Sequence, residues 1–311
     1  MGGSGGELAD AAALLLAAGE AAAPVPLAET DLLAGWLLHA SRLPVPADGP
    51  LALAVGPLAV GAPELRATDG GGFTVAGRLP RVGWARYAAR VAALATGPEG
   101  SDVVLSLDPS AAGVTLVEGA NLAGEPRDDL VLDTEVGAAD VAAAGPGARE
   151  LLVRRAALAR ALLMTGAGVT ALRQSVRYAG ERVQFGRPIA KFQAVQQQLA
   201  LAAAEVAAAR AAVDAAIRIA AASDFAGDDA GLAVAVAKAR VGEMAGAVAR
   251  IAHQVHGAIG FTREHSLRLA TTRLWAWRDE DGDETHWNRE VARRALAAGP
   301  DGLWPLLTRS S

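Results

Sequence analysis

The strongest constraint on the fold of this chain is an alanine-rich stretch, residues 148 to 298, whose pattern is helical almost from end to end. Segments such as "LALAAAEVAAARAAVDAAIRIAAA" combine the residue of highest helix propensity with regularly placed charges, which indicates soluble helices in close contact and not membrane spans. The predicted helices cover about 150–182, 188–222, 230–256, 263–277 and 284–298, and their lengths suit an antiparallel bundle. Spacings of mostly three and four predict one buried stripe on the second helix, made of Val195, Leu199, Ala203, Val206, Val213 and Ile217.

The chain before this stretch shows two other patterns. Residues 7–42 are helical in pattern, in two segments separated by Pro24 and Pro26. From 44 to 142, short β-like runs such as "LALAVGPLAV", "GGFTVAGRLP" and "DLVLDTEV" are separated by Gly, Pro and Asp, which predicts a small antiparallel barrel or sandwich. We therefore expect an α+β fold in three parts: a short, reduced N-terminal helical region (1–43), a middle β domain (44–147) and a C-terminal helical bundle (148–311).

Composition excludes several classes of function. The chain has no cysteine, so disulfides, thiolate metal sites and cysteine nucleophiles are ruled out. Its net charge is −5, and without a basic stripe a nucleic-acid partner is not expected. The N-terminal sequence has no basic region ahead of its short apolar run, so neither a signal peptide nor a membrane span is expected and the cytoplasm is the default location.

The acidic segment "RDEDGDETHWNRE", residues 278–290, has nearly the ligand spacing of an EF-hand calcium loop. Such a loop needs glycine at its sixth position, where this chain has Glu284, so we do not expect calcium binding. The carboxylates are instead predicted to cap and charge the helix that begins near Glu284. His253 and His256 share a helix face but have no third ligand at zinc-site spacing, so no metal site is predicted.

Two motifs carry the functional signal. In "RYAGERVQFGRPIAKFQAVQQQLA", residues 177–200, Arg182 lies between two predicted helices, where a guanidinium beside a helix N-terminus suits an anion. A structural ion pair of Arg182 with a helix carboxylate is the alternative. In "QVHGAIGF", residues 254–261, Gly257 and Gly260 interrupt a helix. They permit close approach of a ligand or another chain, although a simple helix C-cap is the alternative.

Together, and in this order, the two motifs resemble the C-terminal domain of the acyl-CoA dehydrogenase family. The resemblance covers about 150–290, weakens over the β region and is faint in the short N-terminal part. It implies a dimeric or tetrameric assembly, with FAD bound between subunits, and α,β-dehydrogenation of an acyl-CoA thioester, in which a carboxylate removes the α-proton and hydride passes to the flavin. The cofactor-binding residues that it implies are Arg182, Gln184, Phe185, Phe192, Gln193, Gln254, Val255, His256, Gly257 and Ala258.

The chain departs from this family where catalysis is concerned. The family's catalytic glutamate, which precedes a glycine, aligns with Asp281 before Gly282, and aspartate is one methylene shorter. Some members keep the base on the first bundle helix, but Ala156 occupies the matching position here. In the β region the family's Thr-Glu-rich segment ending in Gly-Ser-Asp is missing, and "LPRVGWA" replaces its aromatic-Ile-Ser/Thr run.

These departures predict a chain that keeps the residues offered to a neighbour's flavin and has lost several that would hold its own. Such asymmetry is typical of heteromeric acyl-CoA dehydrogenases of sterol- and polyketide-handling bacteria, in which two related chains form an α2β2 assembly and one carries the base. We expect the non-catalytic partner subunit. There are two alternatives. One is a self-sufficient homo-oligomer that uses Asp281 as base, and the other is a flavin-free structural subunit.

Overall fold

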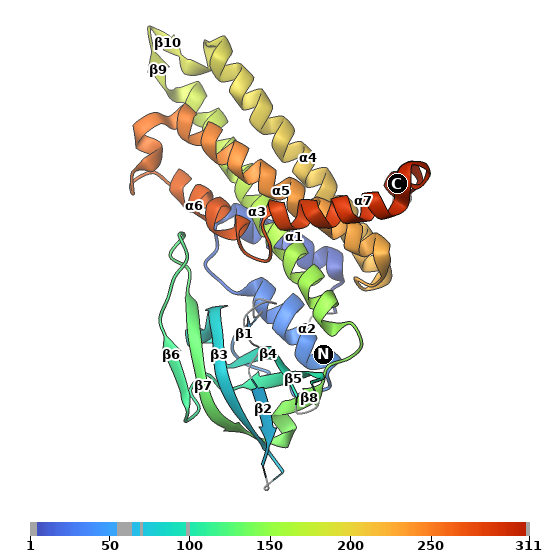
Figure 1. The fold of residues 1–311 in the computed structure, drawn as a ribbon. Helices are drawn as coiled ribbons and strands as arrows, with labels where there is room; N and C mark the ends of the chain where they lie inside the picture. Colours follow the sequence, from blue (N-terminus) through green and yellow to red (C-terminus); the bar gives the residue numbers. More distant parts are fainter. Residues whose placement is uncertain (1–4, 55–63, 69–70, 98–99, 309–311) are drawn as a thin grey trace. The chain divides into compact units, whose positions relative to one another are not determined.

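The structure is a computed structural model that describes all residues except 1–4, 55–63, 69–70, 98–99 and 309–311. The chain forms two compact units (Figure 1). The sheet unit comprises residues 1–5 and 24–153, and the helical unit comprises residues 6–23 and 154–311. Short helices, a β-sheet and a helical bundle follow one another along the chain as predicted, which confirms the α+β class. The first helix belongs to the helical unit and not to the part of the chain next to it, so the three-part division remains a prediction.

One mixed sheet forms the sheet unit, in the order β6-β7-β3-β2-β4-β5-β8 with β1 also paired to β4. The strands are β1 Leu51–Ala54, β2 Glu64–Ala67, β3 Phe73–Gly83, β4 Arg90–Thr96, β5 Asp102–Leu107, β6 Val114–Val117, β7 Arg127–Val136 and β8 Val141–Ala143. Most pairs are antiparallel, as predicted, but β1 and β2 both run parallel to β4. The alternation of apolar and polar residues along a strand indicates which face is buried, but it does not indicate whether the adjacent strand runs parallel or antiparallel. The sequence analysis therefore missed these two parallel pairs. The part of "LALAVGPLAV" beyond residue 54 lies outside the described residues.

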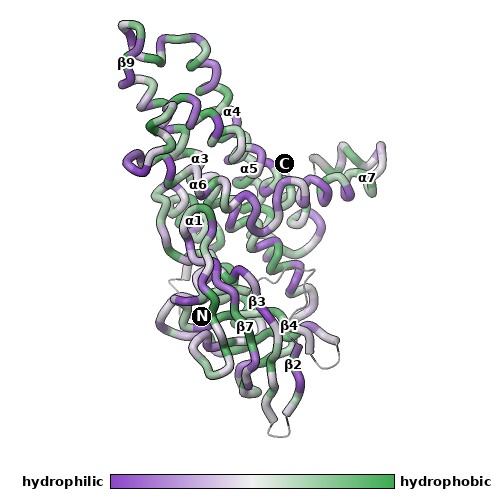
Figure 2. The backbone as a smooth tube through the Cα atoms, turned by 60° about the vertical axis from the view of Figure 1, so that its left-hand side comes forward, coloured by the Kyte–Doolittle hydropathy of each residue, from purple (hydrophilic) through white to green (hydrophobic). Residues whose placement is uncertain are grey.

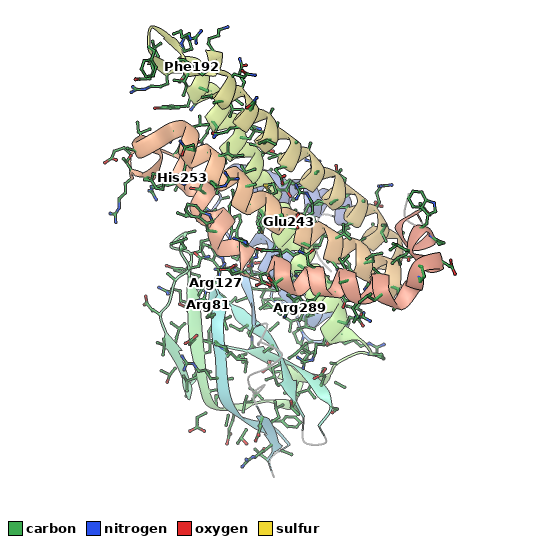
Figure 3. All side chains as sticks on the ribbon, turned by 45° about the horizontal axis from the view of Figure 1, so that its top comes forward. Arg81, Arg127, Phe192, Glu243, His253 and Arg289 are labelled. Atoms are coloured by element: carbon green, nitrogen blue, oxygen red, sulfur yellow. The ribbon has the colours of Figure 1, made fainter. Side chains whose placement is uncertain are left out.

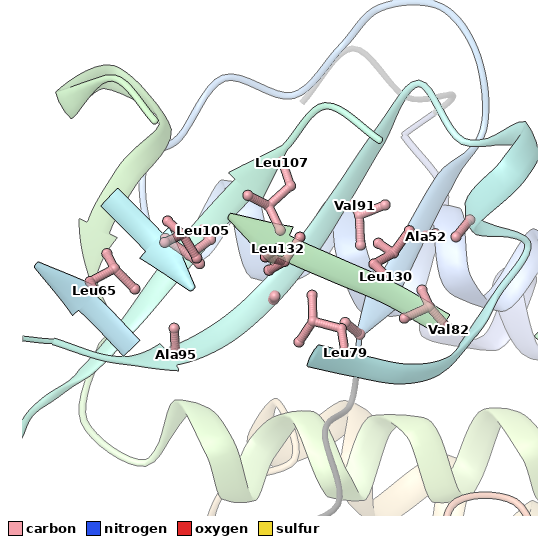
Figure 4. Close-up of a cluster of buried hydrophobic side chains, with 14 residues drawn as sticks. Ala52, Leu65, Leu79, Val82, Val91, Ala95, Leu105, Leu107, Leu130 and Leu132 are labelled. Carbon is pink, nitrogen blue, oxygen red and sulfur yellow. The ribbon is translucent and has the colours of Figure 1, made fainter. Parts of the chain in front are cut away.

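The core of the sheet unit comes from the inward-facing positions of its strands (Figure 4). On β7, Leu130 and Leu132 are buried, whereas Val131 between them and Asp133 after them are exposed. The short helical segments η1 (Glu29–Gly35) and α2 (Trp36–Ala40) supply further buried leucines, and the amide of Leu51 donates a 3.1 Å hydrogen bond to Thr30 Oγ1. This period-two burial is what the sequence pattern predicts for a half-buried sheet.

Polar interactions fix the end of β3 against β7 in the same unit. The segment "LPRVGWA" ends β3 with a bulge between Leu79 and Val82, and Trp84 then adopts a left-handed conformation with φ 63°. The guanidinium of Arg86 pairs with the fully buried carboxylate of Asp128. These main-chain irregularities and the buried ion pair make this a rigid corner of the sheet unit.

The helical unit is an antiparallel bundle with a short helix laid against it (Figure 1). Its helices are α1 Leu8–Glu20, α3 Ala148–Glu181, α4 Gln193–Ser223, α5 Gly227–His256, α6 Leu267–Arg278 and α7 Glu284–Thr308. Green and purple segments alternate along α4 and α5 in Figure 2, as expected of helices with one apolar face. A kink at Gly299, where φ is 67°, divides α7, and the predicted last helix stops just before it.

Small residues set the packing distances in this bundle. A Cβ atom on Gly19 would lie 2.1 Å from the carbonyl oxygen of Leu163, and one on Gly166 would lie 2.1 Å from that of Leu16. α1 and α3 therefore touch backbone to backbone, and any side chain at either glycine would force them apart. This close contact explains why α1 belongs to the helical unit.

Alanine also forms the buried face of α4, which corrects the predicted stripe. Val206 and Val213 are buried as expected, but Ala203 is exposed, and Val195, Leu199 and Ile217 are only half-buried. The observed face consists of Ala202, Val206, Ala209, Val213, Ala216 and Ala220. The prediction followed the larger side chains, whereas close helix packing selects the smaller ones.

Candidate functional site

A β-hairpin joins α3 to α4 at one end of the bundle. It consists of β9 (Val183–Gln184) and β10 (Arg187–Pro188), so Pro188 closes a hairpin and does not open the next helix, which begins at Gln193. The two turn residues, Phe185 and Gly186, have φ values of 52° and 80°, the type I′ geometry of tight hairpins. Phenylalanine is an unusual residue for the first of these positions, because its Cβ is strained at positive φ.

Phe185 is also the most exposed large apolar side chain among the described residues, at 92%. Its ring meets Phe192 edge-on, with centroids 6.0 Å apart, and the guanidinium carbon of Arg187 lies 4.5 Å from the centroid of Phe192 (Figure 3 labels Phe192). A strained and exposed aromatic residue costs free energy in the isolated chain. The tip of the hairpin therefore presents an exposed aromatic ring beside Phe192 and Arg187.

Arg182 lies at the base of the hairpin, directly after the last residue of α3. Its amide donates to the carbonyl of Tyr178 and its carbonyl accepts from Ile189, both at 2.8 Å. The side chain is exposed, and within the described part of the chain it forms no ion pair. The structural-pair alternative for Arg182 thus finds no support. Gln184 and Gln193 are exposed at the same end, and Phe192 precedes α4 without capping it through its side chain.

The second motif forms the end of α5 and the short helix η5 (Gly257–Phe261). Gly257 is the C-cap of α5 at φ 65°, and a Cβ atom there would meet nothing within 4 Å. Gln254, Gly257 and Ala258 are exposed, so they are available to a ligand, whereas Val255 and His256 are buried in the bundle. Direct side-chain contacts of Val255 and His256 with a cofactor do not fit this burial, because their positions on the helix turn them inward.

The two histidines of α5 are packed among aromatic rings. His253, labelled in Figure 3, stacks against Trp275 and Phe261 at centroid distances of 5.2 and 4.1 Å. His256 stacks on Tyr178 at 4.5 Å, and its Nδ1–H donates to the carbonyl of Ala252 at 2.8 Å. Burial lowers the pKa of both imidazoles. Neutral, stacked histidines of this kind hold the end of the bundle together.

The acidic segment that follows α6 is folded onto the bundle. Arg160, in the middle of α3, donates from Nε to Asp281 Oδ2 at 2.9 Å, and one terminal nitrogen lies 3.2 Å from Glu280 Oε2. All three side chains are at least 86% buried. The resemblance aligns Asp281 with the family base, and in this structure the carboxylate of Asp281 is paired with Arg160. Ala156, the other possible base position, is buried and has no carboxylate.

Lys238 of α5 lies beneath the same segment and is fully buried. Its ammonium donates to the main-chain carbonyls of Gly282 and Arg278 at 2.5 and 3.1 Å. Burial lowers the pKa of Lys238 to about 8, an effect that the attraction of Asp281 partly offsets. Arg160 and Lys238 were missed by the sequence analysis, since isolated basic residues in helices give no signal of what they contact.

Two further carboxylates of the segment, Asp283 and Glu284, lie at the helix start as predicted. Asp283 Oδ1 accepts the amide of His286 at 2.7 Å, and Glu284, the first residue of α7, pairs with Arg278. Across the residues that the structure describes, no group of three His, Asp or Glu side chains is arranged to hold a metal ion. Within the same residues, no helix is both long and apolar enough to cross a membrane.

Comparison with known proteins agrees with this arrangement. Residues 148–296 match the acyl-CoA dehydrogenase C-terminal domain. The chain is 30% identical over 274 residues to acyl-CoA dehydrogenase IpdE2 of Mycolicibacterium smegmatis and 31% identical to that of Mycobacterium tuberculosis. These matches span 86% of this chain and 73% and 72% of the two relatives.

The chain belongs to the acyl-CoA dehydrogenase family. Members are oxidoreductases that act on acyl-CoA, so the predicted family and enzyme class are confirmed. The Arg160–Asp281 ion pair leaves open whether this member of the acyl-CoA dehydrogenase family has a working base of its own.

Solved structures of acyl-CoA dehydrogenases match this chain beyond its C-terminal domain. The ChsE4-ChsE5 complex of Mycobacterium tuberculosis matches with a TM-score of 0.86 and 26% identity over 96% of this chain and 83% of that chain. The steroid ACAD Tcur3481-Tcur3483 matches with a TM-score of 0.81 and 26% identity over 93% and 81%. A glutaryl-CoA dehydrogenase of Mycobacterium smegmatis in complex with FADH2 shares the fold at 16% identity, with a TM-score of 0.83 over 94% and 81%.

Proposed function

We propose that this chain is a subunit of an FAD-dependent acyl-CoA dehydrogenase, in which it supplies flavin contacts across a subunit interface while a second, related chain supplies the base. The observation that carries this proposal is the ion pair between Asp281 and Arg160. In this ion pair, Arg160 binds the one carboxylate that aligns with the family base.

An ion pair of this kind makes Asp281 a poor base. A general base must reach the proton that it removes to within hydrogen-bonding distance. To do so, Asp281 would have to leave Arg160, which is only 9% exposed. Leaving Arg160 would cost Asp281 a charge-assisted hydrogen bond in a buried site, worth about 1.5–3 kcal/mol, while Glu280 would stay beside the guanidinium. The shorter aspartate side chain reduces its reach further.

The hairpin end of the bundle fits an anionic dinucleotide. Arg182 offers an exposed guanidinium with donors for a pyrophosphate, and Phe185 and Phe192 offer aromatic faces beside it. Gln184, Gln193 and Gln254 add exposed amide groups, and Gly257 and Ala258 leave space for close approach. FAD, when bound, accepts the β-hydrogen of the substrate as hydride. The residues of this chain bind and orient it.

Two structural relatives support a proposal for the partner and the substrate. ChsE4-ChsE5 is a complex of two differently named chains, and Tcur3481-Tcur3483 is described as a steroid ACAD. Both are 26% identical to this chain. We therefore propose an α2β2 assembly with a second acyl-CoA dehydrogenase chain and a bulky, steroid-type acyl-CoA thioester as substrate.

Co-purification tests this proposal. The chain is expressed alone and together with an acyl-CoA dehydrogenase chain encoded beside it, and flavin is counted per complex by absorbance near ~450 nm. We expect a colourless chain alone and a yellow heterotetramer that oxidises the thioester. A yellow homo-oligomer that is active by itself would establish the Asp281 alternative, and a stable complex without flavin would establish the structural-subunit alternative.

A further inference from the structure

The acidic segment after α6 is held by contacts from two directions. From α3, Arg160 binds the side chains of Glu280 and Asp281. From α5, Lys238 binds the main-chain carbonyls on either side of them, at Arg278 and Gly282. One cation therefore fixes the carboxylates of the segment and the other fixes its backbone.

The backbone of this segment adopts a conformation that needs such support. Asp281 has φ 57° and Gly282 has φ 89°, so two successive residues are left-handed. Non-glycine residues rarely adopt this conformation unless their surroundings enforce it. Asp281 is thus held in a strained conformation at the position where the family places its base.

Aromatic packing closes the segment on its third side. The indole Nε1–H of Trp287 donates to the carbonyl of Asp281 at 2.9 Å, and Trp287 is buried. A Cβ atom on Gly282 would lie 2.5 Å from Trp287 Nε1 and 2.9 Å from His286 Cδ2. A side chain at position 282 would therefore clash with residues of α7.

Ion pairs engage several charges of the segment. Arg160 pairs with Glu280 and Asp281, and Arg278 pairs with Glu284. Buried charges persist in a protein when they are paired and hydrogen-bonded. Loss of Arg160 would therefore leave two largely buried carboxylates without this cation.

We infer that Arg160 and Lys238 are positioning residues that form a charge lock over residues 278–284, holding Asp281 away from any substrate. This inference rests on the proposed function, because it explains why the position of the base is inactive. It goes further in assigning the inactivity to two residues outside the catalytic motif. In this lock, the carboxylate of Asp281 serves to hold α3, α5 and α7 together and does not act as a base.

Amide hydrogen exchange tests the lock directly. In the purified chain, and in its complex if one forms, exchange is followed by mass spectrometry in the peptide that covers residues 278–287. We expect Arg160→Met and Lys238→Met each to speed exchange in this peptide at least ~10-fold while peptides of the sheet unit stay unchanged. Arg173→Met is the matched control, because Arg173 lies on the same helix but pairs with Glu20 at the surface.

A second set of variants separates a charge lock from simple packing. In the Glu280→Gln, Asp281→Asn background the anions are gone, so adding Arg160→Met should change exchange by less than ~2-fold if charge is what Arg160 provides. An effect of Arg160→Met that persists undiminished in that background would overturn the lock, as would unchanged exchange in the single variants.

These outcomes are independent of the proposed function. Flavin count and partner binding, measured on the same samples, test the subunit assignment, whereas exchange in 278–287 tests the lock. If a single variant fails to fold, the lock is tested by Arg160→Lys, which keeps the charge but loses the two-pronged geometry and should give intermediate exchange. Arg160→Lys exchange as slow as in the unchanged chain would count against the assigned geometry.

Discussion

Asp281 and Arg160 are 121 residues apart in the sequence, yet their side chains form a 2.9 Å hydrogen-bonded ion pair inside the helical bundle. The relationship changes the meaning of the acidic segment. The carboxylate that the resemblance aligns with the family base is here the partner of an arginine on another helix.

Arg182→Ala should remove most of the flavin from the assembled protein and leave the fold intact. The side chain is exposed and without an ion pair among the described residues, so the isolated chain loses nothing on truncation. A pyrophosphate loses charge-assisted hydrogen bonds worth about 1.5–3 kcal/mol each, or roughly tenfold or more in affinity. The flavin-to-protein ratio is the measurement, with Arg218→Ala on α4 as control. An unchanged ratio contradicts the proposed role of Arg182.

Asp281→Asn should change the turnover of the complex by less than about twofold. Loss of a true general base typically costs about 10²–10⁴ in rate, so the two outcomes are easily told apart. Steady-state oxidation of an acyl-CoA by the purified complex is the measurement. The same substitution at the exposed Asp279 is the control. A large loss of turnover for Asp281→Asn alone, with normal assembly, would restore this chain to catalytic status.

Phe185→Gly should stabilise or leave unchanged the isolated chain but weaken the assembly. Glycine adopts the positive φ of this turn freely, which relieves about 1 kcal/mol of strain, and a ring that is 92% exposed contributes little to folding. The melting temperature of the chain alone should therefore stay the same or rise, whereas the dissociation constant of the complex should increase. If both properties stay unchanged, the hairpin tip is not an interface. Leu296→Ala, at an exposed site on α7, is a control for the loss of an exposed apolar side chain, because alanine keeps the helix propensity.

Lys238→Met should change how stability depends on alkaline pH. Because burial lowers the pKa of Lys238 from 10.5 to about 8, the folded chain releases this proton while the unfolded chain still holds it. The free energy of unfolding of the unchanged protein should thus rise, relative to the variant, between pH 8 and 10.5. The upper limit is about 3 kcal/mol, from roughly 1.4 kcal/mol per pKa unit. The measurement is the free energy of unfolding in denaturant at pH 7 and at pH 10. If the unchanged protein and Lys238→Met differed by the same free energy at both pH values, the lowered pKa would be refuted.

The sequence predicted those parts of the molecule that depend on local pattern. Helical periodicity placed α3, α5 and the first part of α7 to within a few residues, and alternation located the main strands of the sheet. The two motifs predicted the family, which the comparisons confirm. Arg182, Gln184 and Phe185 lie together at the hairpin because they are neighbours in the chain, so their grouping needed no tertiary information.

Only the tertiary structure decided which residues meet across the chain. The partners of Asp281, the parallel pairing of β1 and β2 with β4, and the alanine face of α4 all depend on contacts between distant segments. A residue's periodicity indicates how much of it is buried, but the free energy of an ion pair depends on which opposite charge is buried beside it. That choice is fixed when the helices pack, and for this reason the sequence pointed to Asp281 but could not show that its carboxylate pairs with Arg160.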